Sequence, residues 1–266
     1  MKQNKIYSYP EMEKQLQQWR KHYSSDIYQL ESLGLTYGKR HIYACHIGPS
    51  NAKNRFAITA SIHGREYINT TLLLHMIDYH LNHIRQDICL SFVPMANPDG
   101  VSISMNSDAR HWKENGKGID LNRNFPAGFG LSTDRRKRNP GAAPADQLET
   151  QYLMKFVNAL DHPLGIIHYH SRGNLIYYDY HVTGPLRKRI EQLAASAHET
   201  TGYKLATGTK DTKPAGGFGD WCVYEKKMPS ITIETGFLKT PVPKWQLNGI
   251  CERNLFLLRD LFTRIL

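Results

Sequence analysis

The chain has 266 residues, of which 40% are hydrophobic and 22% are charged, and its formal net charge at pH 7 is +10. This composition is ordinary for a globular protein and excludes an intrinsically disordered one, and no apolar run approaches the length of a membrane span. Basic residues are dispersed except at 135–138, a run without interleaved aromatic residues that we interpret as a solvated loop. We therefore expect no nucleic-acid partner and no membrane partner.

The N-terminal residues have neither the apolar core nor the small-residue cleavage site of a secretory signal, so we expect a cytoplasmic protein. The four cysteines are widely spaced and form no C-x-x-C pair. We expect neither a disulfide framework nor a structural zinc site built from them. Cys45 and Cys89 lie in apolar runs and are predicted to be small core residues.

The periodicity of apolar residues predicts alternating strands and helices along the chain. A Gly-, Asn- and Asp-rich stretch at 97–144 has little periodicity, and loops of that length are usually functional. Elsewhere the pattern predicts helices at 10–22, 67–81, 145–160, 185–201 and 245–264, and strands at 27–33, 41–47, 55–62, 88–95, 165–170, 174–180 and 229–234.

Strands that alternate with helices indicate an α/β fold with a mixed, mostly parallel twisted sheet and helices on both faces. No linker or repeat divides the chain, so we expect a single catalytic domain over residues 1–266. Ligands of such sheets bind at the carboxyl ends of the strands. His63, Asn97, His170 and Glu234 all lie at predicted strand ends and therefore form a candidate site.

His63 and Glu66 lie at a predicted strand-to-helix turn, where an imidazole and a carboxylate can bind one metal ion. A catalytic zinc site needs three protein ligands and one open position. His170 is the best third candidate because it ends its strand, although His168 points to the same face and periodicity alone does not exclude it. Glu234 ends an apolar strand, where a carboxylate is unfavourable unless it is paired or has a chemical role, so we predict that it is the general base. The alternative is a structural ion pair with a neighbouring arginine.

Short polar motifs follow one another between about residues 55 and 240. They are H-x-x-E at His63 and Glu66, N-P-D-G at 97–100, D-x-N-R-N at 120–124, H-S at 170–171 and G-G-x-x-D-W at 216–221, with Glu234 fourteen residues after Asp220. One such motif is weak, but several in this order are hard to obtain by chance. In these motifs the chain resembles the zinc metallocarboxypeptidases, the carboxypeptidase A-like group.

The resemblance implies one zinc ion held by His63, Glu66 and His170, with Glu234 as the general base. It also implies that Asp120 orients His63 through a hydrogen bond, as partners of metal-bound histidines commonly do.

The resemblance also implies that Arg65 and Arg123 are cationic groups in the cleft, and we assign Arg65 a catalytic role as a cation that can stabilise the oxyanion. Asn122 and Arg123 would grip the terminal carboxylate of the substrate through the planar guanidinium fork.

The chain departs from this family at two positions. The arginine that stabilises the oxyanion in the family follows a tryptophan, whereas Trp112 is followed by Lys113, to which we assign the oxyanion role. Twenty-two residues before Glu234, where the family carries a mobile active-site tyrosine, this chain has Thr212. A threonine does not replace a phenol, so closure over a C-terminal side chain is not expected to follow the family pattern.

With these departures the chain resembles the bacterial branch of γ-D-glutamyl-meso-diaminopimelate peptidases, in which H-G-R-E, Trp-Lys and H-S-x-G segments occur. Gly219 takes the specificity-pocket position and leaves room for a longer or polar group, and Arg172 is a further cation for an anionic substrate. We predict a small peptide or muropeptide substrate cleaved at the γ-D-glutamyl–diaminopimelate bond. The alternatives are an ordinary metallocarboxypeptidase that removes C-terminal residues and a non-catalytic binder of peptidoglycan fragments.

Overall fold

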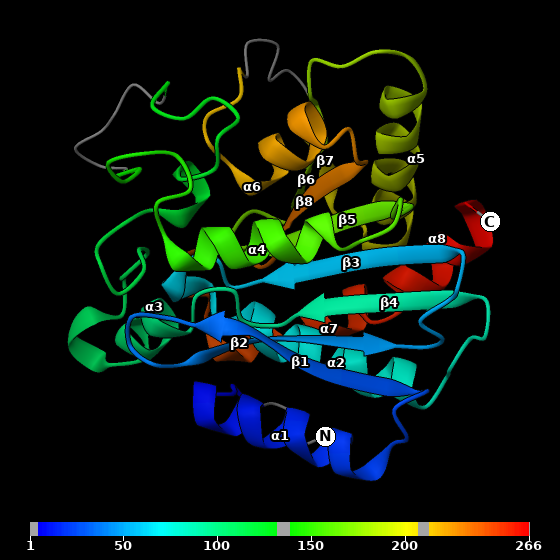
Figure 1. Cartoon of the computed structure of the whole chain (residues 1–266), viewed down its shortest axis with the longest axis horizontal. Coiled ribbons are helices and arrows are strands. Elements are labelled where there is room, and N and C mark those ends of the chain that lie inside the picture. The colour runs from blue at the N-terminus through cyan, green and yellow to red at the C-terminus, as the bar shows by residue number, and fades with distance from the viewer. Residues whose placement is uncertain (1–4, 132–138, 207–212, 266) are drawn as a thin grey trace.

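The strands form one mixed eight-stranded sheet in the part of the chain that this computed structural model describes, namely residues 5–131, 139–206 and 213–265 (Figure 1). Their order across the sheet is β1-β2-β4-β3-β5-β8-β6-β7. The central pairs β4–β3, β3–β5 and β5–β8 are parallel. The strands are β1 Tyr28–Leu35, β2 His41–Ile47, β3 Asn54–Ala60, β4 Ile88–Val93, β5 Gly165–His170, β6 Leu175–Tyr177, β7 Lys204–Leu205 and β8 Ser230–Glu234.

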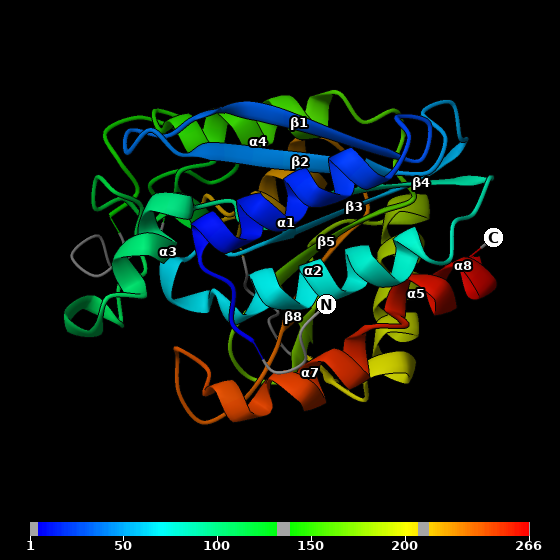
Figure 2. The same ribbon diagram turned by 90° about the horizontal axis from the view of Figure 1, so that it is seen from below.

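Helices cover both faces of this sheet, with α4 on one side and α2, α7 and α8 on the other (Figure 2). The predicted α/β fold is therefore confirmed. The α-helices are α1 Tyr9–His22, α2 Ile68–Leu81, α3 Pro98–Ser104, α4 Leu148–Asn158, α5 Gly184–Thr201, α6 Phe218–Asp220, α7 Leu247–Asn254 and α8 Leu257–Ile265.

Side chains alternate between two cores along the central strands, as the pleat of a strand requires. Ile167 and Tyr169 of β5, with Ile231 and Ile233 of β8, pack into the core formed with α2, α5, α7 and α8. The residues that alternate with them along the two strands include His168, His170 and Glu234. They therefore point to the other face, where α4 and α6 lie. The polar side chains at the ends of β5 and β8 therefore share one face of the sheet.

The structure divides one predicted helix and contains short elements that periodicity did not predict. The stretch 97–144 contains the short helix α3, which begins at Pro98 and fits closely against the turn at Gly64, where a Cβ on Gly64 would lie 2.3 Å from the carbonyl oxygen of Gly100. Tertiary packing stabilises a helix too short to be recognised from periodicity. The predicted helix 245–264 is two helices, α7 and α8, because the first packs on α2 and the second on α5. β7 was not predicted.

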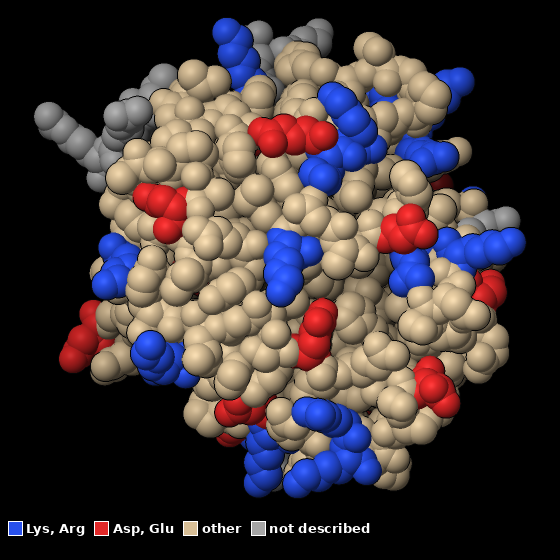
Figure 3. Space-filling view, viewed as in Figure 1, with Lys and Arg blue, Asp and Glu red and all other residues tan. Residues whose placement is uncertain are grey.

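Charged side chains of both signs are interspersed on the face seen in Figure 3, in keeping with the dispersed basic residues of the sequence. The basic run at 135–138 lies outside the described residues. Cys45, Cys89 and Cys222 are buried, and none of the four cysteines forms a disulfide. Among the described helices, none is long and apolar enough to cross a bilayer.

Candidate active site

The site lies where the chain reverses its direction of travel across the sheet. From β3 the chain passes through α2 to β4 on one side, and it later returns to β5 on the other side of β3. Ligands of open α/β sheets bind at such a switch point. His63 follows the end of β3, Glu66 closes the 3₁₀ turn Gly64–Glu66, and His170 ends β5. Neighbouring parallel strands therefore bring all three side chains to one edge of the sheet.

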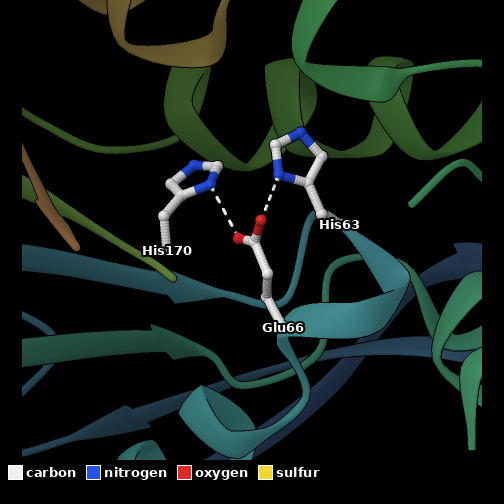
Figure 4. Close-up of side chains that lie close together, drawn as sticks. All are labelled: His63, Glu66 and His170. Carbon is white, nitrogen blue, oxygen red and sulfur yellow. Dashed lines mark hydrogen bonds and ion pairs between the residues drawn. The ribbon is translucent and has the colours of Figure 1, made fainter. Parts of the chain in front are cut away.

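The Glu66 carboxylate lies between the two imidazole rings (Figure 4). Its Oε1 is 2.8 Å from Nδ1 of His63, and its Oε2 is 2.9 Å from Nδ1 of His170. The backbone N–H of Ser171 also donates to Oε2, at 3.2 Å. One ligand atom from each of these three residues lies within 4.8 Å of the others, and all three residues are buried. This set of two imidazoles and one carboxylate fits a catalytic zinc ion with an open coordination position.

Asp120 links His63 to Lys113. Its Oδ1 is 3.2 Å from Nε2 of His63, and its Oδ2 is 2.5 Å from Nζ of Lys113. A hydrogen bond from Nε2–H to this buried carboxylate leaves Nδ1 of His63 for a metal ion. The predicted partnership of Asp120 with His63 is therefore present in the structure. Lys113 lines the metal-side wall of the site, and its ammonium group is paired with Asp120.

Charge interactions outweigh burial at these groups. Burial opposes the charge of Glu66, but the adjacent His63 and His170 hold the pKa of its carboxyl well below the usual range. Burial likewise opposes the charge of Asp120, and His63 together with Lys113 lowers its pKa. Burial disfavours the cationic form of His63, yet the charge of Glu66 raises the pKa of that imidazole. Both carboxylates are thus ionised at neutral pH and available as acceptors or ligands.

Glu234 differs from both of them. It is the register partner of His170 across the parallel pair β5–β8, and no described residue hydrogen-bonds its buried Oε2. Burial, with a further contribution from the negative charge of Glu66, raises the pKa of Glu234 to about 7, against the opposing charges of His170, Lys113 and Arg172. A carboxyl group with such a pKa can accept and return a proton near neutral pH.

Two connected cavities surround these residues. The one that we call the metal-side cavity has a volume of about 500 Å³, and it contains His63, Glu66 and the predicted cationic residues. The other, which we call the side pocket, has a volume of about 270 Å³. Both are lined by Asn122, Arg123, His170, Tyr177, Thr232 and Glu234.

Asn122 and Arg123 lie in the 3₁₀ turn Leu121–Arg123, at the junction of the two cavities. The side-chain oxygen of Asn122 accepts a hydrogen bond from the backbone N–H of Phe218 at 2.9 Å, which fixes the amide. Gly216 has a positive φ of 77°, and a Cβ there would lie 2.4 Å from the carbonyl oxygen of Arg123. The G-G-x-x-D-W motif therefore packs against the turn that carries the predicted carboxylate clamp.

The other residues predicted for catalysis and substrate binding line one cavity or the other. Arg65 and Arg172 line the metal-side cavity, and Nε of Arg65 is buried without a hydrogen bond to a described residue. Gly219 lines the side pocket, but a Cβ on it would lie 2.5 Å from the hydroxyl oxygen of Tyr180. The space that this glycine provides is thus taken by Tyr180 and is not open to a longer substrate group in this conformation.

His168 is held by hydrogen bonds to neighbouring strands. Its Nδ1 is 3.1 Å from the hydroxyl of Thr59, its Nε2 is 2.7 Å from the hydroxyl of Ser230, and its ring packs edge-on against Phe218. Burial holds the pKa of this imidazole well below its ordinary value. With both ring nitrogens engaged, His168 is a core residue, as its position before the strand end suggested.

Asp99, in the N-P-D-G motif, forms hydrogen bonds with residues outside the site. Its carboxylate accepts hydrogen bonds from the hydroxyl of Thr36, the backbone N–H of Gly38 and Nη1 of Arg40, all at 2.8 to 2.9 Å. Asn97 meanwhile donates to the carbonyl oxygens of Ile62 and Glu114. The motif therefore ties the β1–β2 hairpin and the His63 turn to α3.

Sequence reasoning missed Tyr177, which lines both cavities. In the antiparallel pair β6–β8 it lies opposite Thr232, two residues from Glu234, so that its side chain lies on the cavity face. Only the register of β6 shows that Tyr177 faces the cavities, because nothing in the local sequence distinguishes it from the adjacent Tyr178. Thr212, the position of the missing family tyrosine, lies outside the described residues.

Known proteins resemble this chain in sequence and in fold. The profile of a protein family described as zinc carboxypeptidase matches residues 12–256. Gamma-D-glutamyl-L-diamino acid endopeptidase 1 of Lysinibacillus sphaericus is 24% identical over 244 residues, which cover 77% of this chain and 60% of that protein.

Two solved structures share the fold. Carboxypeptidase A from Helicoverpa armigera has a TM-score of 0.82 at 19% identity, over 98% of this chain and 72% of that chain. Murein-tripeptide amidase MpaA from Escherichia coli O157 has a TM-score of 0.62 at 21% identity, over 87% of this chain and 91% of that chain.

Proposed function

The chain belongs to the zinc carboxypeptidase family and is therefore a metallopeptidase, and on this basis we propose that it hydrolyses the amide bond between γ-D-glutamate and diaminopimelate in peptides derived from peptidoglycan. We propose that His63, Glu66 and His170 hold one zinc ion and that Glu234 is the general base. We also propose that residues 1–266 act as a single catalytic domain, since all the described strands belong to one sheet.

The observation that carries the substrate proposal is the charge of the metal-side cavity. Arg65, Arg123 and Arg172 line it together with Lys113, whose charge is offset by Asp120, while its carboxylates are Glu66 and Glu234, which have roles in the proposed chemistry. A cavity with this excess of cations favours a substrate that carries several carboxylates. Peptidoglycan stem peptides are such substrates, and a distant relative is named for a γ-D-glutamyl bond.

Each residue of the site has a separate role in the proposed reaction. Arg123 and Asn122 bind the terminal carboxylate, and this fixes the scissile amide between the ligand set and Glu234. When bound, zinc supplies a Lewis acid and lowers the pKa of a water molecule. Glu234 accepts the proton of the attacking water and returns it to the leaving amine. Arg65 and Lys113 contribute positive charge beside the developing oxyanion.

The test uses the zinc-loaded protein with the tripeptide L-alanyl-γ-D-glutamyl-meso-diaminopimelate and with a benzoylated dipeptide, and identifies the products by mass spectrometry. We expect free diaminopimelate and L-alanyl-D-glutamate from the tripeptide. Cleavage of the benzoylated dipeptide alone would favour the ordinary carboxypeptidase and contradict the proposed substrate. Binding of the tripeptide without any product, with zinc present, would favour the non-catalytic alternative.

A further inference from the structure

A third cavity, which we call the basic hollow, opens beside the metal-side cavity. Its volume is about 220 Å³, and its lining includes Arg110, His111, Lys239 and Lys244 but no Asp or Glu. Among the described residues, none of these four side chains takes part in a salt bridge. The three permanent cations among them, Arg110, Lys239 and Lys244, repel one another, and an anion bound between them would offset that repulsion.

The basic hollow adjoins the metal-side cavity along two segments. Tyr67, on its wall, directly follows Glu66, and Thr240, on the wall of the metal-side cavity, lies between Lys239 and Pro241. The imidazole Nδ1 of His111 is 3.0 Å from the carbonyl oxygen of Thr240, which joins the two sides. A ligand could therefore extend from the metal-side cavity into the hollow.

The hollow also has a defined direction relative to the scissile bond. The side pocket contains Asn122 and Arg123, and it shares no lining residue with the basic hollow. The metal-side cavity lies between them, because it shares Arg123 with the side pocket and adjoins the hollow at Thr240. The hollow therefore lies on the side of the metal-side cavity away from the side pocket, where the acyl portion of a substrate held at Arg123 would extend.

We propose that the basic hollow is a subsite for a carboxylate on the acyl side of the scissile bond. In a γ-linked glutamyl substrate this group is the free α-carboxylate of the glutamate, an identification that rests on the proposed function. The subsite makes the enzyme discriminate between glutamyl and isoglutaminyl peptides, which differ only in the amidation of that carboxylate. The discrimination is electrostatic and therefore weakens as salt is added.

The experiment compares kcat/KM for L-alanyl-γ-D-glutamyl-meso-diaminopimelate and for its α-amidated isoglutaminyl form. The double variant Arg110→Gln/Lys244→Gln removes a charge from each side of the hollow. Lys155→Gln, at an exposed position of α4 that lines neither the hollow nor the two cavities, is the matched control, and Arg172→Gln tests whether the cavity wall is responsible instead. Because each exposed ion pair contributes at most about fivefold, we expect the double variant to reduce the preference for the glutamyl form about five- to tenfold.

Three results would overturn the subsite: no preference in the parent enzyme, a preference unaffected by the double variant, or an equal loss of rate on both substrates. A preference abolished by Arg172→Gln alone would also overturn it. The same comparison with benzoyl-glutamyl and benzoyl-glutaminyl dipeptides separates this inference from the proposed function. If the double variant has a smaller preference for the glutamyl dipeptide than the parent enzyme, the subsite is supported even when the γ-linked peptides are not cleaved. Calorimetry with the zinc-loaded Glu234→Gln variant measures the ratio of the affinities for the glutamyl and isoglutaminyl peptides without turnover.

Discussion

Replacement of Glu234 by glutamine tests the proposed general base and its buried environment together. The substitution keeps the shape of the side chain but removes its charge and its ability to accept a proton. General-base catalysis contributes about 100-fold or more to rate, so we expect kcat to fall by at least that factor while zinc remains bound. The change should also affect the stability of the metal-free protein, in a direction set by the pKa of Glu234.

Burial raises the pKa of this carboxyl from 4.5 to about 7 in the folded protein. Between these values the folded state retains a proton that the unfolded state has released, so the free energy of unfolding decreases as pH rises through this window. A shift of this size corresponds to about 3 kcal/mol above pH 7. Glutamine lacks this charge at every pH, and the metal-free variant should therefore be more stable than the parent by about 3 kcal/mol at pH 8.

The assay is thermal unfolding of the chelator-treated proteins at pH 8 and pH 4, beside activity measured with zinc. At pH 8 we expect the melting temperature of the variant to exceed that of the parent by about 5 °C or more, and at pH 4 the two should coincide. Glu225→Gln, at an exposed position, is the control and should change neither activity nor melting temperature. Equal pH dependence of parent and Glu234→Gln unfolding would refute the buried-charge argument, and retained activity would remove Glu234 from the mechanism.

Three further substitutions probe the residues around it. Asp120→Asn weakens the partner of the His63 imidazole, and we expect zinc affinity to fall about 10- to 100-fold in a chelator competition; unchanged affinity would show that Asp120 does not orient the ligand. Arg123→Lys removes the guanidinium fork, so KM should rise about tenfold with little change in kcat, whereas a change confined to kcat would contradict the assigned clamp. Tyr177→Phe removes a hydroxyl that lines both cavities, and kcat/KM should fall about fivefold without a change in melting temperature. Full activity of this last variant would show that the hydroxyl makes no contact with the substrate.

Periodicity predicted the elements that form the centre of the sheet. The runs at 41–47, 88–95, 165–170 and 229–234 are short, apolar and bounded by polar residues, so their burial on both faces could be inferred. The elements that periodicity missed are those whose stability comes from contacts distant in sequence. The helix α3 depends on close approach between the Gly64 turn and Gly100, and the two-residue strand β7 depends on its pairing with β6.

The candidate site shows the same division. The residue types that can bind a metal ion and move a proton were recognisable from the sequence, because a carboxylate or an imidazole at the end of an apolar strand is unfavourable without a partner. The choice between His168 and His170 was not decidable by strand period, since both side chains point to one face. It depended on the hydroxyls of Thr59 and Ser230, which neighbouring strands place against His168.

The sequence by itself determined the family resemblance, the order of the polar motifs and the kind of chemistry that His63, Glu66, His170 and Glu234 can support. Tertiary structure alone decided which atoms of these residues meet, that Asp120 is shared by His63 and Lys113, and that Tyr177 and Tyr180 reach the cavities. The physical reason is that residue chemistry and local period are properties of the chain itself. Convergence at one edge of the sheet depends on strand order and register, which non-local hydrogen bonds and core packing fix.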